Sequence, residues 1–175
     1  TDFSYAFSDS INLEELYINF NNITKNLMYM CSNCPALIRV ISESLDLSNV
    51  VNIKGVFNQC ISLEEEFDFR TLNTSTKHTG APIAVYRGCV SLKSITKLRL
   101  PISFTWTDGK DNVIDHYSPI LDCPNLVTVT EYDVSFTNSF PTEFPEAIVY
   151  SYQNEQGFSQ FNSSNFSSLT HIDFK

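Results

Sequence analysis

One pattern of apolar positions recurs along the chain. The apolar residues do not keep the constant spacing of one long helix or one long strand. Its template is Cys-x-x-Leu-x-x-[Ile/Leu/Val], seen most clearly in "CISLEEEF" from Cys60 and "CVSLKSI" from Cys89. Four more segments follow the template, with serine replacing cysteine in the first and phenylalanine replacing it in the last. The Cys positions are Ser10, Cys34, Cys60, Cys89, Cys123 and Phe166. Such recurrence indicates a repeat architecture.

The spacing of the template leucines sets the size of each unit. Three of the spacings lie within the roughly 20–29 residues of leucine-rich repeats, and two exceed that range. We therefore predict one domain over residues 1–175, with about six units and with insertions near 71–80, 104–115 and 132–162. The leucines are Leu13, Leu37, Leu63, Leu92, Leu126 and Leu169, which lie 24, 26, 29, 34 and 43 residues apart.

Each unit is predicted to hold a helical turn followed by a strand. An apolar residue three positions before the Cys position predicts one turn of helix in segments such as "IKGVFNQC" and "PIAVYRGC". Alternation after the leucine predicts a short strand. The fold class is therefore an α/β repeat solenoid, with short parallel strands on one face and helical turns or loops on the other. Glu66 stands where the template expects an apolar residue, and Phe67 follows one place late, which predicts a one-residue bulge.

The segment "SNVVNIKGVFNQCISL", residues 48–63, resembles the BspA-like leucine-rich repeats of bacterial surface proteins. Those repeats typically read Ser-Asn-Val-Thr-Asn-Met, then an apolar residue and Phe, two residues, and Cys-x-Ser-Leu. The resemblance implies a curved solenoid with one strand per turn. It also implies protein binding and adhesion at a microbial surface without catalysis, and an extracellular or cell-surface location. The matching residues are Ser48, Asn49, Val50, Asn52, Phe57, Cys60, Ser62 and Leu63.

Charge and hydropathy exclude two classes of partner. The chain carries 20 acidic against 11 basic residues, a formal net charge of -9. Nucleic acid and anionic membranes attract basic surfaces, so neither is an expected partner. The longest unbroken apolar run, Leu27 to Cys31, is far too short to cross a bilayer, and we predict no membrane insertion.

Residues able to carry chemistry have a structural interpretation in each case. "CSNC" at Cys31 and Cys34 lacks the second ligand pair that a zinc site needs, and both positions belong to the repeat. The three histidines, His78, His116 and His171, lie far apart in the sequence. "EEEFD" at residues 64–68 has no EF-hand spacing and is typical of a solvated acidic strand face. We predict no enzyme activity, catalytic residue, metal or cofactor, and buried, inert thiols.

The exposed positions of the strands form the predicted binding face, because strands commonly line the concave side of a solenoid. Their mixed character suggests a protein or glycan partner. We also predict that the chain is a piece of a longer repeat protein. The alternative function is a structural component of a larger assembly such as a phage virion, whose neighbouring subunits would cover the ends of the chain. The aromatic segment 135–161 would then be a contact surface, or it would cover the end of the stack. The candidate partner-binding residues are Glu14, Glu15, Tyr17, Arg39, Glu64, Glu65, Lys93, Thr128 and His171.

Overall fold

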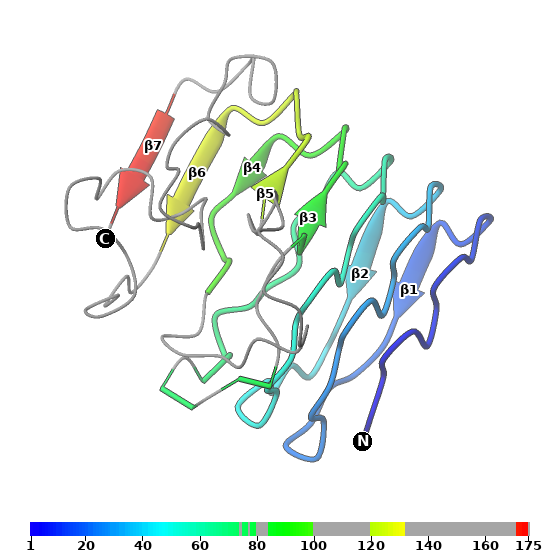
Figure 1. The fold of residues 1–175 in the computed structure, drawn as a ribbon, viewed down its shortest axis with the longest axis vertical. Helices are drawn as coiled ribbons and strands as arrows, with labels where there is room; N and C mark the ends of the chain where they lie inside the picture. The colour runs from blue at the N-terminus through cyan, green and yellow to red at the C-terminus, as the bar shows by residue number, and fades with distance from the viewer. Residues whose placement is uncertain (74, 77, 80–83, 100–119, 132–170, 175) are drawn as a thin grey trace, which may run out of the picture.

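The structure is a computed structural model, which describes residues 1–73, 75–76, 78–79, 84–99, 120–131 and 171–174. Within these residues, successive segments of chain run side by side in one direction and hydrogen-bond to the next segment (Figure 1). We number the repeats units 1 to 6 after the Cys positions given above. The first and last strands lie at opposite ends of the row (Figure 1). Two of the predicted insertions, 104–115 and 132–162, lie outside the described residues, and 71–80 is described only in part.

The described residues hold seven short strands, all paired in parallel. Strand β1 pairs with β2, β3 pairs with β5, and β4, β6 and β7 form a three-stranded sheet in that order. Strands β3 and β5 begin three residues before a Cys position, and the others follow a template leucine. Their bounds are β1 Glu15–Tyr17, β2 Arg39–Ile41, β3 Tyr86–Arg87, β4 Ser94–Ile95, β5 Ile120–Leu121, β6 Thr128–Glu131 and β7 His171–Phe174.

The strand register follows the spacing of the template leucines. Glu15 stands opposite Arg39, which is 24 residues later, as Leu37 is after Leu13. Ser94 stands opposite Thr128, and Thr128 opposite His171, offsets of 34 and 43 residues. Residues at the same template position therefore lie side by side. The longer spacings between Leu92, Leu126 and Leu169 therefore leave the pairing in register.

Unit 3 departs from its neighbours where the sequence predicts a bulge. Residues 64–69 form no assigned strand. The carbonyl oxygen of Ile38 accepts hydrogen bonds from the N–H groups of both Glu64, at 3.0 Å, and Glu65, at 3.4 Å. The carbonyl oxygen of Lys93 accepts from Val127 and Thr128 in the same way, beside two strands that pair in register, so this pattern does not establish the predicted bulge. Phe67, one position late in the template, is buried in the core.

The Tyr86 side chain hydrogen-bonds to the backbone of Phe67, in a segment that forms no assigned strand. The Phe67 N–H donates to the Tyr86 hydroxyl oxygen at 3.1 Å, and the Tyr86 hydroxyl donates to the Phe67 carbonyl oxygen at 3.2 Å. Tyr86 is fully buried, and its ring stacks on Phe57 with centroids 5.5 Å apart. Since buried backbone groups need partners, this hydroxyl satisfies the Phe67 N–H and carbonyl oxygen inside the core.

Tight turns take the place of the short helix expected before each Cys position. The residues five and one before that position have positive φ, for example 53° at Tyr29 and 58° at Asn33 in unit 2. A right-handed helix requires negative φ at every residue, so two left-handed residues four apart prevent it. No helix is present in the described ranges. The corresponding residues elsewhere are Tyr5 and Asp9, Gly55 and Gln59, Ala84 and Gly88, and Asp122.

Backbone amides in these turns alternate between two kinds of partner. In unit 1, Tyr5 and Phe7 donate across to unit 2, to the carbonyl oxygens of Met28 at 3.0 Å and Met30 at 2.9 Å. Ser8, between Phe7 and the next crossing residue, instead donates back to the Tyr5 carbonyl oxygen at 3.1 Å and closes a turn. The turns therefore hold neighbouring units together through a ladder like that of a parallel sheet.

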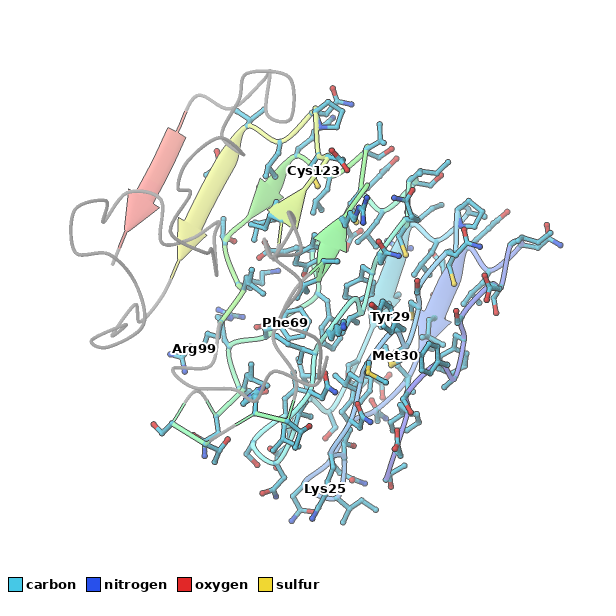
Figure 2. All side chains as sticks on the ribbon, in the orientation of Figure 1. Lys25, Tyr29, Met30, Phe69, Arg99 and Cys123 are labelled. Carbon is cyan, nitrogen blue, oxygen red and sulfur yellow. The ribbon has the colours of Figure 1, made fainter. Side chains whose placement is uncertain are left out.

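The core lies between the turns and the strands. Leu37, Leu63, Leu92 and Leu126 are all fully buried, and Leu13 of unit 1 is half-buried. Met30 and Phe69, both fully buried, point into the same interior (Figure 2). Burying such side chains contributes about 1.5–3 kcal/mol each, so the template leucines stabilise the row together with the other buried apolar residues.

Candidate interaction surface

The described part of the predicted binding face is accessible. Glu14, Tyr17, Glu64, Glu65 and Lys93 are exposed, and Glu15, Arg39 and Thr128 are half-buried. We call these eight residues the strand face. The backbone of His171 pairs with Thr128 in the sheet, but its side chain lies outside the described residues.

A row of ion pairs crosses the strand face through three units. Arg39 in β2 lies 2.5 Å from a carboxylate oxygen of Glu15 in β1 and 3.2 Å from one of Glu65 in unit 3. All three side chains are at least partly exposed, so their contribution to stability is small. Their effect is positional, because one guanidinium fixes two carboxylates on neighbouring units.

Tyr17 is joined to the same row. Its hydroxyl donates to Glu15 at 2.8 Å, and its ring is 68% exposed. The Tyr17 hydroxyl, and then Arg39, lower the pKa of the Glu15 carboxyl. The pKa of Tyr17 is raised in turn, chiefly by that hydrogen bond to Glu15. The strand face therefore presents an aromatic ring beside a carboxylate whose charge is held at neutral pH.

Two further carboxylates on this face have no ion pair within the described ranges. Glu14 and Glu64 are exposed, and each lies one position after its unit's template leucine. Lys93 takes the same position in unit 4 and is also exposed. The face is therefore acidic in units 1 to 3 and has a positive charge in unit 4.

An apolar row borders the strand face, and our sequence analysis did not single it out. Ile11, Ile61 and Val90 each follow a Cys position directly, and they are 60%, 44% and 39% exposed. The half-buried prolines Pro35 and Pro124 take the same place in units 2 and 5. We call these five residues the apolar ridge. The signal was an apolar residue after the Cys position in five of the units, which an alignment on buried positions overlooks.

The thiols have a structural role instead of forming a metal line. Each described cysteine at a Cys position donates to the carbonyl oxygen of the residue three before the Cys position in the preceding unit. Cys60, for example, donates to Cys31 at 3.0 Å. All five cysteines are buried, and none of them forms a disulfide. The other thiol bonds are Cys34 to Phe7 at 3.0 Å, Cys89 to Phe57 at 3.2 Å and Cys123 to Tyr86 at 2.8 Å.

Burial also makes these thiols weakly acidic. Desolvation raises the pKa of Cys60 to about 12 and raises the pKa of Cys31, Cys34 and Cys89 as well. A thiol rather than a thiolate therefore prevails at neutral pH, and the thiolate is the nucleophile and metal ligand. Within the described ranges, no group of three or more histidine, cysteine or acidic side chains is placed to hold a metal ion.

The acidic run at residues 64–68 does not converge on one point. Glu65 pairs with Arg39, while Asp68 pairs with Arg70 at 2.5 Å. Glu66 turns toward unit 4, where it accepts hydrogen bonds from the N–H of Thr96 and, at 2.9 Å, from its hydroxyl. Since calcium needs several oxygens around one centre, the arrangement favours the solvated acidic face.

His78 is placed in the core and not on the strand face. It is fully buried, its Nε2 lies 3.4 Å from the Asn73 carbonyl oxygen, and its Nδ1 has no hydrogen-bond partner. Desolvation lowers the pKa of His78 to about 4. His116 lies outside the described residues.

No family model matches the chain, and neither a curated protein nor a solved structure matches it significantly. The described residues include no helix long and apolar enough to cross a membrane.

Proposed function

We propose that this chain is an irregular leucine-rich-repeat solenoid that serves as a non-enzymatic interaction module, binding a protein or glycan at a microbial surface. The parallel register of equivalent positions supports the solenoid, because repeat units stack in this way. The resemblance of residues 48–63 to BspA-like repeats supports the location and the class of function.

The strand face carries the functional part of the proposal. It combines an exposed tyrosine ring with carboxylates that are held in place by bonds between units, through Glu15, Tyr17 and Arg39. Binding to such a face loses little side-chain freedom, because the groups are already ordered before the partner arrives. Tyrosine and arginine are also enriched at protein interfaces.

Selection from two probe sets tests the proposed function. The full chain is immobilised and offered a random peptide display library and a printed glycan array. We expect enriched ligands whose binding is lost when Tyr17 is replaced by alanine. The matched control is Tyr5→Ala, because Tyr5 is also well exposed, at 54%, but belongs to the turns. Ligands that bind both variants equally, or no enriched ligand from either set, would overturn the proposal.

A structural role in a larger assembly is our second proposal, and the apolar ridge favours it. Ile11, Ile61 and Val90 present apolar side chains that a neighbouring subunit could cover. Sedimentation of the chain at increasing concentration separates the two roles. An interaction module stays monomeric, whereas a subunit of a homomeric assembly associates, and Ile61→Ser then reduces the association.

A further inference from the structure

The strand face and the apolar ridge lie next to one another along the chain. The ridge residue of each unit precedes the exposed residue after the template leucine by three positions, as Ile11 precedes Glu14 and Ile61 precedes Glu64. Three residues span at most about 11 Å. Units 1 and 3 therefore each present an exposed isoleucine and an exposed glutamate within reach of a single partner segment.

The charge of this patch is unbalanced. Its carboxylates are Glu14, Glu15, Glu64 and Glu65, and the only opposing cation among the strand-face residues of units 1 to 3 is Arg39. Arg39 is already shared between Glu15 and Glu65. Glu14 and Glu64 thus remain exposed, with no ion pair in the part of the chain that the structure describes.

We propose that units 1 to 3 dock a cationic, amphipathic polypeptide segment, with its apolar side chains on Ile11 and Ile61 and its lysines or arginines on Glu14 and Glu64. This inference rests on the proposed binding function and names the class of partner. The charge complementarity of a basic segment selects it over an acidic or neutral one, because like charges across an interface are costly.

The spacing of the two glutamates sets the form of the segment. They lie two units apart, and neighbouring parallel strands are about 4.8 Å apart, so their separation along the row is roughly 10 Å. An extended segment of the polyproline II type has three residues per turn and advances about 3.1 Å per residue. Basic residues three apart in such a segment lie on one face, about 9 Å apart, and therefore reach both carboxylates, with apolar residues between them for the ridge. Such a segment runs across the strands, along the row of units.

Glycans and nucleic acid fit the patch less well. A neutral glycan would leave both carboxylates without a counter-charge, and a nucleic acid would bring phosphates against them. A second copy of the chain would place one acidic patch against another, given the formal net charge of -9.

Fluorescence anisotropy with labelled peptides of about twelve residues tests the proposal, using the full chain. The probe has lysine at every third position and valine or leucine between. One control peptide replaces its lysines by glutamate, and another replaces its apolar residues by serine. The matched protein variants are Glu64→Lys against Glu43→Lys, and Ile61→Ser against Ile23→Ser. Glu43 is exposed like Glu64, Ile23 is 57% exposed against 44% for Ile61, and both control positions lie outside the patch.

We expect binding that weakens with salt and is absent for the glutamate peptide. Glu64→Lys should weaken binding about ten-fold at low ionic strength, because it replaces an attraction by a repulsion. Ile61→Ser should weaken it about five-fold. Glu43→Lys and Ile23→Ser should change it by less than about two-fold.

Equal effects of Glu64→Lys and Glu43→Lys would overturn the inference, because binding would then follow the overall charge. Equal binding of the serine-substituted peptide would also overturn it, by showing that the ridge is unused. A Tyr17-dependent ligand without basic residues, found in the library or glycan selection, would leave the interaction module standing and sink only the cationic partner. If the peptide library, the glycan array and the labelled peptides all give no binding, both the interaction module and the cationic partner are wrong.

Discussion

The turns and the strand face differ in what repeats from unit to unit. In the turns, the backbone itself recurs: left-handed residues stand one and five positions before the Cys position in units 1 to 4, and the thiol bond to the preceding unit is the same four times. On the strand face, the register recurs but the side chains do not, since Glu15, Arg39 and Glu65 occupy equivalent places with different charges. The turns therefore hold neighbouring units together, and the side chains of the strand face are free to vary.

The contrast has a physical cause. The side of each turn that lines the core, as at Cys31 and Cys60, must satisfy its own amides and carbonyls, because no water reaches them. The thiol fits this need, since it is small, apolar and still able to donate weakly. On the solvent side, backbone groups pair within the ladder and side chains meet water, so most residue types are tolerated there.

The largest difference in stability is expected between two neighbouring residues, one in the core and one on the strand face. Leu63→Ala should lower the free energy of unfolding by about 4 kcal/mol, because it leaves a cavity in a close-packed core. Glu64→Ala should change the free energy by less than roughly 0.5 kcal/mol. Urea unfolding measures both, and similar values for the two variants would mean that the leucine row is not a core.

The pH dependence of stability tests whether the segment around His78 belongs to the packed part. The folded pKa of about 4 lies below the ordinary value of 6.5. The unfolded chain then binds the proton more tightly, so stability is complete above pH 6.5 and falls by about 3 kcal/mol toward pH 4.

His78→Gln should flatten the stability curve in that window. Lowered pKa values at Asp46 and Asp68 add further losses, but only at more acid pH than the histidine window. The raised pKa of Glu66 acts in the opposite direction, because its protonation on acidification relieves a desolvated charge. A curve unchanged by His78→Gln would place the imidazole in water.

Two glycines in the turns give a matched pair. Both Gly55 and Gly88 have positive φ, 61° and 70°, so alanine is strained at either one. A Cβ at Gly55 would lie 2.2 Å from the Tyr29 ring, whereas one at Gly88 would meet the flexible Gln59 side chain at 2.7 Å. We expect Gly55→Ala to cost about 2 kcal/mol and Gly88→Ala about 1 kcal/mol. In thermal unfolding, adding Tyr29→Ala should recover part of the first loss, and equal costs would contradict the contact.

The Tyr86 hydroxyl, which hydrogen-bonds to the backbone of Phe67, is expected to have a smaller effect on stability. Tyr86→Phe should cost about 1.5 kcal/mol, because the N–H and carbonyl of Phe67 lose their partner in the core. Tyr17→Phe, at an exposed hydroxyl, is the control and should cost less than roughly 0.5 kcal/mol. Hydrogen exchange at the Phe67 amide should accelerate only in the first variant.

The thiol hydrogen bond predicts which of two substitutions at Cys60 is more stable. If the thiol only filled space in the core, the order of the two stabilities would be reversed. Cys60→Ser keeps a donor for the Cys31 carbonyl oxygen, whereas Cys60→Ala does not. We therefore expect the serine variant to be more stable by about 1 kcal/mol in urea unfolding. If alanine is the better replacement, the thiol fills space and its hydrogen bond contributes nothing.

Much of the repeat could be predicted from the sequence, because buried positions leave a hydrophobic pattern. The leucine spacing matched the strand register, and Phe67, which stands one position late in the template, is buried in the core. The turns could not be predicted in the same way. An apolar residue before the Cys position is compatible with a helix or with a turn. Tyr29 and Gln59 have left-handed backbone but are not glycines, so the sequence gives no sign of this conformation.

The sequence by itself determined which residues face the interior, because apolar side chains must leave water wherever the chain folds. Only the tertiary structure decided which exposed groups meet. Arg39 joins Glu15 and Glu65 from separate units, and the apolar ridge forms from residues at least 24 positions apart. Such contacts depend on how the units stack, and no local pattern records them.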